Sequence, residues 1–148
     1  MAADAYELAL KALGRKERSS AELARWLRER GVADDDVDEV VGRLTEIGEL
    51  DDGRFALRYA EDKRELAGWG AERIRLALLA RGIASEHVEA AVAVDSEGIQ
   101  IRRASDLLAR RERGLESDAD RASALSYLTR RGYSYEIAHE AIRAARVP

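Results

Sequence analysis

The chain has 148 residues, 46% of them hydrophobic and 36% charged, and its net charge is −4. It contains no cysteine, which excludes disulfides, thiol catalysis and zinc–thiolate sites together. No apolar run approaches the roughly 20 residues needed to cross a bilayer, and the N-terminus lacks the basic stretch of a signal peptide. We therefore expect a cytoplasmic protein that makes no use of a membrane.

The composition favours helices throughout. Aromatic residues make up only 5% of the chain, and the only proline, Pro148, is the last residue. Ala, Leu, Glu and Arg dominate, and all four have high helix propensity. An all-α fold is the expectation.

The first fifty residues predict three helices. Asp4 can cap the first of them. Ser19 and Glu22 have the spacing of a capping box, in which each side chain satisfies an orphan backbone N–H at a helix start. Asp34 or Asp35 is expected to cap the third helix, whose apolar positions recur at helical spacing.

The same plan recurs twice along the chain. Asp51 or Asp52 is expected to cap the fourth helix, and Ser85 the sixth. The seventh helix, from about Ser96 to Arg113, is expected to be the longest, and Ser134 to cap the last helix. The helix pattern thus predicts three sets of three.

An Arg-Gly pair follows the second predicted helix of each of these three sets. It occurs at Arg30-Gly31, Arg81-Gly82 and Arg131-Gly132, so the glycines lie 51 and then 50 residues apart. Glycine ends a helix in the left-handed conformation without a Cβ penalty, and a cation in the last turn suits the helix dipole. These arginines are therefore expected to need no partner. The turn after Gly132 reads as one residue shorter than the other two.

A fixed period of about 50 residues is typical of tandem repeats. We predict three three-helix repeats, at residues 1–50, 51–94 and 95–148. Their net charges are −4, −1 and +1, so an anionic partner would meet the second and third repeats first.

No catalytic or metal-binding constellation is visible. The two histidines, His87 and His139, fall at corresponding surface places in two repeats and are not a converging pair. Asp51 and Asp52 are better explained as a helix start than as an acid/base pair. The turn Gly68-Trp69-Gly70 lacks the strand and the Lys-Ser/Thr of a phosphate loop. We expect no enzymatic activity, no cofactor and no metal.

Arginine is the residue type that suggests a partner. The chain has 22 Arg and 3 Lys, and the third repeat holds the clusters Arg102-Arg103, Arg110-Arg111 and Arg130-Arg131. Arginine pairs bidentately with carboxylate or phosphate, so these clusters suggest a protein or nucleic-acid partner. The alternative is that they form a solvent-exposed face and bind nothing. A helix-turn-helix reading of the first repeat fails, because its third helix carries Asp34 to Asp36, which phosphates would repel.

Four stretches in order resemble the RecX family of bacterial RecA regulators. They are Arg18-Ser19-Ser20-Ala21-Glu22-Leu23, then Leu50-Asp51-Asp52-Gly53-Arg54-Phe55-Ala56, then Gly68-Trp69-Gly70-Ala71-Glu72-Arg73-Ile74, and finally Tyr127-Leu128-Thr129-Arg130-Arg131-Gly132-Tyr133-Ser134-Tyr135. The resemblance covers nearly the whole chain.

The resemblance implies an elongated, curved, all-helical array. It also implies a monomer that binds RecA and the RecA–single-stranded DNA filament, and that inhibits strand exchange, ATP hydrolysis and coprotease activity. The acidic first repeat places more weight on contact with protein than on weak direct contact with DNA.

We place the contact surface in the second and third repeats, where arginines and aromatic side chains are available. The candidates are Arg54, Arg58, Tyr59, Trp69, Arg73, Arg102, Arg103, Arg110, Arg111 and Arg130. For the two aromatic residues, burial in their own repeat core is an equal alternative. A single-stranded nucleic-acid-binding module and a helical scaffold for an unrelated partner also remain open.

Overall fold

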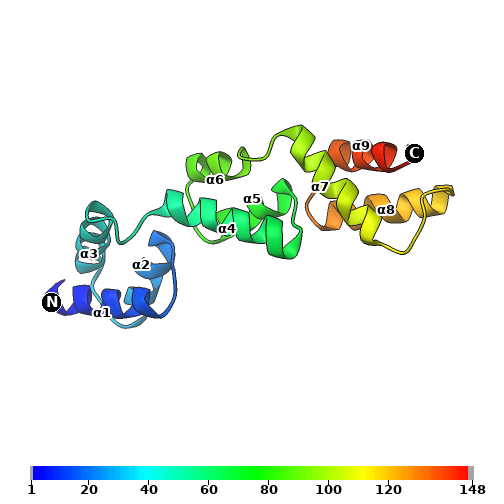
Figure 1. Ribbon diagram of the computed structural model, residues 1–148. Helices are drawn as coiled ribbons and strands as arrows, with labels where there is room; N and C mark the ends of the chain where they lie inside the picture. Colours follow the sequence, from blue (N-terminus) through cyan, green and yellow to red (C-terminus); the bar gives the residue numbers. More distant parts are fainter. Residues whose placement is uncertain (1, 147–148) are drawn as a thin grey trace.

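The computed structural model describes residues 2–146, and over that range the protein is all helical, as its composition predicts (Figure 1). The nine helices there are α1 (Ala2–Arg15), α2 (Ser20–Glu29), α3 (Asp34–Glu46), α4 (Asp52–Ala67), α5 (Ala71–Ala80), α6 (Ser85–Val92), α7 (Glu97–Arg110), α8 (Asp118–Arg130) and α9 (Tyr135–Ala145). They form an elongated row, with α1 at one end and α8 and α9 at the other (Figure 1). None of them is long and apolar enough to span a membrane.

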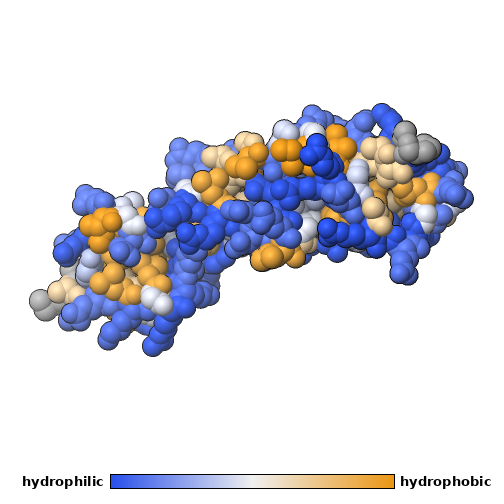
Figure 2. Space-filling view, viewed as in Figure 1, coloured by the Kyte–Doolittle hydropathy of each residue, from blue (hydrophilic) through white to orange (hydrophobic). Residues whose placement is uncertain are grey.

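Each set of three consecutive helices encloses its own hydrophobic core. We call these sets the first unit (α1–α3), the second unit (α4–α6) and the third unit (α7–α9). The leucine four residues before each Arg-Gly glycine is fully buried in its unit: Leu27, Leu78 and Leu128. Figure 2 shows the outcome on one face, where hydrophilic surface separates hydrophobic patches over the three units. The division of the chain after residues 50 and 94 stays a prediction.

Several predicted caps are confirmed. Ser19 and Glu22 form the capping box of α2, and the Asp51 side chain accepts from the backbone N–H of Arg54 at the start of α4. Asp52 has a different role: it accepts a hydrogen bond from the backbone N–H of Ser20 in the first unit, at 2.9 Å. The second of these two adjacent carboxylates therefore joins two units.

Other predicted caps are wrong. Asp34 and Ser85 are the first helical residues of α3 and α6, and the cap positions are Ala33 and Ala84, which make no side-chain hydrogen bond. Ser134 caps α9 as predicted. The three turns after the Arg-Gly pairs are consequently equal in length, and the expected shortening after the third glycine is absent.

Two helix boundaries also differ from expectation. Asp4 lies in the first turn of α1 rather than before it. The helix α7 ends at Arg110, and α4, with 16 residues, is longer. Arg111 is extended, and its guanidinium donates to the Ser123 hydroxyl and lies 4.7 Å from the Tyr127 ring centroid. These contacts with α8 turn the chain back before it reaches Arg113.

The first and second units meet where the N-terminus of α2 lies against the C-terminus of α5. We call this contact the first joint. The Ser19 hydroxyl donates to the carbonyl of Arg81 at 2.7 Å, and the Arg81 guanidinium pairs with both carboxylate oxygens of Glu22 at 3.0 and 3.1 Å. A Cβ on Gly82 would lie 2.5 Å from the Cβ of Ala21, so only glycine allows this approach.

The second joint repeats the arrangement one unit later, with the N-terminus of α5 against the C-terminus of α8. The backbone N–H of Gly70 donates to the carbonyl of Arg131 at 2.8 Å, and that of Glu72 to the carbonyl of Gly132 at 2.9 Å. A Cβ on Gly132 would lie 2.6 Å from the backbone nitrogen of Arg73. Arg131 also donates to the carbonyl of Ala67 in the second unit, at 2.9 Å.

The joints overturn, for Arg81 and Arg131 but not for Arg30, the expectation that the Arg-Gly arginines need no partner. Arg81 and Arg131 each contribute a carbonyl and a guanidinium to the neighbouring unit. The positive N-terminus of one helix meets the negative C-terminus of the next, an arrangement that the helix dipoles favour. Helices α2, α5 and α8 thus stack head to tail along the molecule.

Glycine at a joint should be harder to replace than glycine at a free turn. Gly31, Gly48 and Gly132 all have positive φ (82°, 80° and 100°), so alanine costs about 1–2 kcal/mol of backbone strain at each. At Gly132 the methyl group also meets the backbone of Arg73, which adds roughly 1–3 kcal/mol of overpacking. Urea unfolding of the three alanine variants measures the difference, and equal losses at all three sites would contradict the joint.

Glu22 should make the first joint sensitive to acid. Partial burial raises its pKa, but hydrogen bonds from Arg81 and Ser19 outweigh burial and leave the pKa below its ordinary value. Its stabilising effect is therefore complete above the unfolded pKa of about 4.3 and is lost as pH falls through the lower folded pKa.

The variant Glu22→Gln keeps the capping box but loses the charge that pairs with Arg81. We expect the variant to have a lower free energy of unfolding than the wild type near pH 7. As pH falls to about 3, the free energy of unfolding should decrease less in the variant than in the wild type. Denaturant titrations at the two pH values check this. An identical acid dependence in both proteins would contradict it.

Candidate functional site

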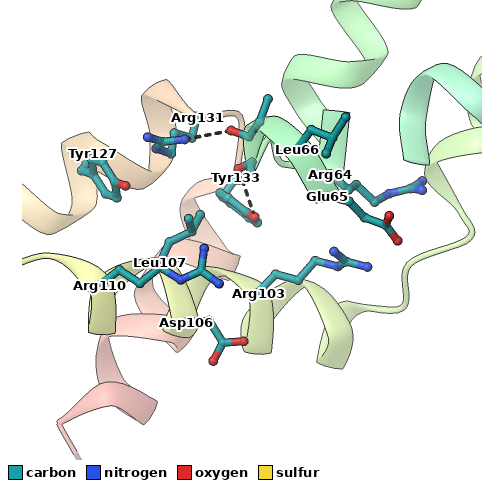
Figure 3. Close-up of a pocket in the computed structure, with 12 residues that line it drawn as sticks. Arg64, Glu65, Leu66, Arg103, Asp106, Leu107, Arg110, Tyr127, Arg131 and Tyr133 are labelled. Carbon is teal, nitrogen blue, oxygen red and sulfur yellow. Dashed lines mark hydrogen bonds between the residues drawn. The ribbon is translucent and has the colours of Figure 1, made fainter. Parts of the chain in front are cut away.

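A cleft of about 470 Å³ lies beside the second joint, between the end of α4 and the third unit (Figure 3). Its lining includes four arginines, two acidic residues and two tyrosines, together with apolar atoms. They are Arg64, Glu65, Leu66, Ala67, Gly68, Arg103, Asp106, Leu107, Arg110, Tyr127, Arg131 and Tyr133. Four guanidinium groups against two carboxylates give the lining a net positive charge, and Figure 3 shows Asp106 pointing away from α4.

Arg64 lines the cleft from the buried side of α4. It follows Ala56 and Ala60 at intervals of four residues, so it occupies a core-facing position of the helix. Its Nε lies 3.2 Å from Oδ2 of Asp95, and the two side chains are only 7% and 10% exposed. A further hydrogen bond runs to the carbonyl of Ala91.

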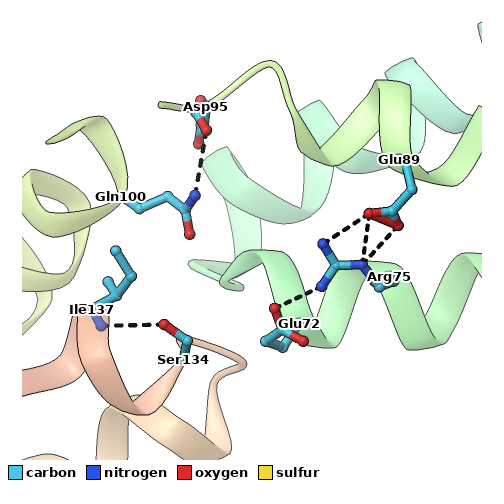
Figure 4. Close-up of polar contacts among 7 residues, drawn as sticks. All are labelled: Glu72, Arg75, Glu89, Asp95, Gln100, Ser134 and Ile137. Carbon is cyan, nitrogen blue, oxygen red and sulfur yellow. Dashed lines mark hydrogen bonds and ion pairs between the residues drawn. The ribbon is translucent and has the colours of Figure 1, made fainter. Parts of the chain in front are cut away.

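Asp95 holds a second arginine as well. The Nε of Arg103, on α7, lies 3.1 Å from the same carboxylate oxygen. The backbone carbonyl of Asp95 accepts from the side chain of Gln100 at 3.3 Å, which fixes the α6–α7 connection (Figure 4). One carboxylate thus ties the second unit to the third and orients two arginines of the cleft.

Tyr133 closes the inner end of the cleft. Its hydroxyl lies 3.4 Å from the carbonyl of Gly68 across the second joint. Burial raises the pKa of this phenol above its ordinary value, although Arg103 and Arg131 oppose the shift. The tyrosine is therefore a neutral hydrogen-bonding group at neutral pH.

Two lining residues remain available to a partner. Within residues 2–146, Arg110 takes part in no ion pair, and its side chain is exposed at the mouth of the cleft. Leu66, on α4, is 85% exposed, more than any other large hydrophobic residue described. An unpaired guanidinium and an exposed leucine in one cleft suit a partner segment that combines acidic and apolar side chains.

The predicted contact residues do not form one site. Arg103 and Arg110 line the cleft, whereas Arg111 is bound to Ser123. Arg102 and Arg130 are exposed.

The predicted residues of the second unit lie elsewhere. Arg54 donates to the carbonyl of Gly48, and Arg58 pairs with Glu17 at 3.4 Å near the first joint. Tyr59 and Trp69 pack half-buried against the second core, and Arg73 lies 4.1 Å from the Trp69 ring centroid.

Only two of the lining residues, Arg103 and Arg110, were predicted as contact residues, and those missed include Arg64, Leu66, Arg131 and Tyr133. For Arg64 and Leu66 a signal was present. On α4, Arg64 continues the buried stripe of Ala56 and Ala60, whereas Leu66 lies off this stripe and is exposed. Such an exchange of polar and apolar positions points to a contact outside the helix's own core.

Arg75 is committed to the internal structure of the second unit. Its ion pair with Glu89, at 2.8 Å, joins α5 to α6, and it also pairs with Glu72 of its own helix at 2.6 Å (Figure 4). These hydrogen bonds, the one to Glu89 foremost, raise the pKa of Arg75. His87 and His139 lie in α6 and α9, five and seven residues after their glycines, so their places do not correspond. Among the described residues no group of three His, Asp or Glu side chains could hold a metal.

The chain matches two family models: the first three-helix domain of RecX over residues 5–44, and the second over residues 51–92. The chain belongs to the RecX family. The regulatory protein RecX of Mycobacterium ulcerans is 35% identical over 95% of this chain and 83% of its own length. That of Stenotrophomonas maltophilia is 38% identical over 91% of this chain and 83% of its own length.

The fold is also that of a solved RecX structure. The crystal structure of RecX from Lactobacillus salivarius matches with a TM-score of 0.89, at 23% identity, over 97% of this chain and 96% of that one. This likeness confirms the elongated all-helical fold that the sequence resemblance implied.

Asp95 should be essential to the cleft and to the stability of the molecule. Asp95→Ala leaves the buried guanidinium of Arg64 without its carboxylate, and we expect a loss of about 3–5 kcal/mol in the free energy of unfolding. Glu140→Ala, which breaks the exposed pair with Arg143, is the matched control and should cost at most about 1 kcal/mol. Urea titration compares them, and similar small losses would contradict the role of Asp95.

Proposed function

We propose that this protein is a regulator that binds RecA and the RecA–single-stranded DNA filament and inhibits the recombinase, ATPase and coprotease activities of RecA. The observation that carries the proposal is membership of the RecX family, whose curated members are regulatory proteins. RecA as the partner rests on the family resemblance described above.

The shape of the molecule supports a polymeric partner. Three units in a row offer a long surface, and each unit contacts only its neighbours, as in other repeat proteins. Several modest contacts held on one scaffold act together, so the affinity for a filament can greatly exceed that of any single contact. A row of similar units suits a binding site that itself repeats.

The cleft beside the second joint is the part of that surface best suited to protein contact. Arg110 supplies an unpaired cation and Leu66 an exposed apolar side chain. The arginines Arg64 and Arg103 are already held by Asp95 and would not have to be ordered on binding. We infer that an acidic and apolar segment of RecA enters here.

Binding of single-stranded nucleic acid is the second candidate. Arg102, Arg110 and Arg130 are exposed in the third unit. A protein that worked through phosphate contacts alone would have an affinity for free DNA that falls steeply with salt. The net charge of −4 and the acidic α3 favour the protein partner instead.

The decisive experiment is RecA ATP hydrolysis on single-stranded DNA with increasing amounts of this protein. Inhibition is expected at or below one molecule per RecA. Full activity at an equal ratio would overturn the proposal. Inhibition with no measurable binding to free DNA would remove the nucleic-acid alternative.

Two substitutions test whether the cleft makes the contact. Arg110→Glu and Leu66→Ser should each raise the half-inhibitory concentration by roughly tenfold or more, as expected for central interface residues. Arg25→Glu on α2 and Leu76→Ser on α5 are matched controls, because both residues are exposed and neither lines the cleft. Equal effects of cleft and control variants would place the contact elsewhere.

A further inference from the structure

The first unit carries the same Arg-Gly helix end as the other two, but within residues 2–146 no other unit lies against its glycine. Gly31 has φ +82°, close to the +79° of Gly82. A Cβ on Gly31 would meet no described atom within 4 Å, whereas at Gly82 and Gly132 the neighbouring unit fills that space. The C-terminus of α2 is therefore half of a joint without its other half.

This open half is already arranged as in a complete joint. The Arg30 guanidinium lies 3.6 Å from the ring centroid of Trp26, four residues earlier. Arg131, which completes the second joint, lies over Tyr127 at the same spacing, with a distance of 4.8 Å. A cavity of about 270 Å³ opens beside Gly31. We call the surface formed by Arg30, Gly31 and this cavity the socket.

The opposite end of the molecule presents the complementary half. The N-terminus of α8 reads Ser117-Asp118-Ala119-Asp120, and that of α2, which fills the first joint, reads Ser19-Ser20-Ala21-Glu22. In both, the cap serine accepts from the third helical N–H, at 3.0 and 3.1 Å. Ala119 therefore matches the residue that lies against Gly82, and Asp120 matches the partner of Arg81.

We propose that residues 117–120 of one copy dock in the socket of a second copy and form a third joint of the same kind. The cap serine would donate to the carbonyl of Arg30, Ala119 would lie against Gly31, and Asp120 would pair with the Arg30 guanidinium. The contact is head to tail, so it does not close on itself and can be repeated by further copies. The stack of α2, α5 and α8 would then continue from molecule to molecule.

Charge makes this contact weak in dilute solution. Asp4 and Asp36 line the socket, and Asp118 and Asp120 stand on the incoming helix end. Asp120 must also give up or share Arg113, which holds it at 2.9 Å. The repulsion between acidic groups is screened by salt, so association should strengthen as salt is raised. Copies held side by side on a polymer have a high effective concentration, where a weak contact is populated.

Sedimentation equilibrium of the full chain over a wide concentration range, at low and high salt, tests the proposal without RecA. The average mass should rise with concentration and more steeply at high salt. Gly31→Asn tolerates the left-handed conformation but fills the socket, so it should weaken association by about tenfold or more. Gly48→Asn is the matched control, because Gly48 has φ +80° with nothing within 4 Å and lies in no joint.

A second pair of variants tests the N-terminus of α8, the other half of the contact. Ala119→Leu should abolish association, and Ala122→Leu on the same helix should leave it unchanged, since both alanines are exposed and neither change empties a core. A constant monomer mass, or equal behaviour of Gly31→Asn and Gly48→Asn, would overturn the proposal.

Cross-linking identifies which ends meet. The chain has no cysteine, so Glu29→Cys and Glu116→Cys each introduce a unique exposed thiol next to one end of the proposed contact and leave Arg30 and Asp120 in place. With a flexible bis-maleimide, a mixture of the two should give dimers far faster than a mixture of Glu29→Cys with Glu61→Cys. Equal rates would show that the ends do not dock. If the protein stays monomeric while Gly31→Asn weakens inhibition of RecA, the socket takes a helix of the partner, and self-association is refuted.

Discussion

The fold depends on the close approach of one helix N-terminus to the C-terminus of another across a glycine. Each core is small, and the cores do not merge, so the order of the units is set at the two joints. There a left-handed glycine removes the Cβ that would hold the helices apart, and orphan N–H and C=O groups of the two helix ends find partners. A few polar contacts therefore fix the positions of three units relative to one another.

The candidate cleft is a product of the second joint. It lies where the end of α4 crosses the third unit, and two of its residues, Arg131 and Tyr133, also belong to the turn that makes the joint. Asp95 adds an independent connection, since one carboxylate holds an arginine from each side. Arg64 and Arg103 are thus held in the cleft wall, whereas Arg110 and Leu66 are exposed and can meet a partner.

Local signals in the sequence predicted much of this fold. The capping box at Ser19 and the left-handed glycine at 31 depend on neighbours within a few residues, and both are confirmed. The caps at Ala33 and Ala84 were missed because alanine lacks the polar side chain by which an N-cap is recognised in a sequence. Partners that come from another unit leave no local signal at all.

The cleft was only partly predictable for the same reason. Arg103 and Arg110 stood out as members of clusters, but nothing in a single repeat indicates that Asp95 collects arginines from α4 and α7. Leu66 was not among the predicted contact residues, because a leucine in a helix is usually buried. Its exposure follows once the stripe of Ala56, Ala60 and Arg64 is known to face the core.

The separation of the three cores also sets how the molecule deforms. Within a unit, interlocked side chains resist any change of shape. Between units there are chiefly hydrogen bonds and ion pairs between backbone turns and side chains, and these tolerate small rotations. Bending and twisting are therefore concentrated at two points along the row. Such a jointed rod can adjust its pitch to a helical surface that stretches or compresses beneath it, without unfolding any of its parts.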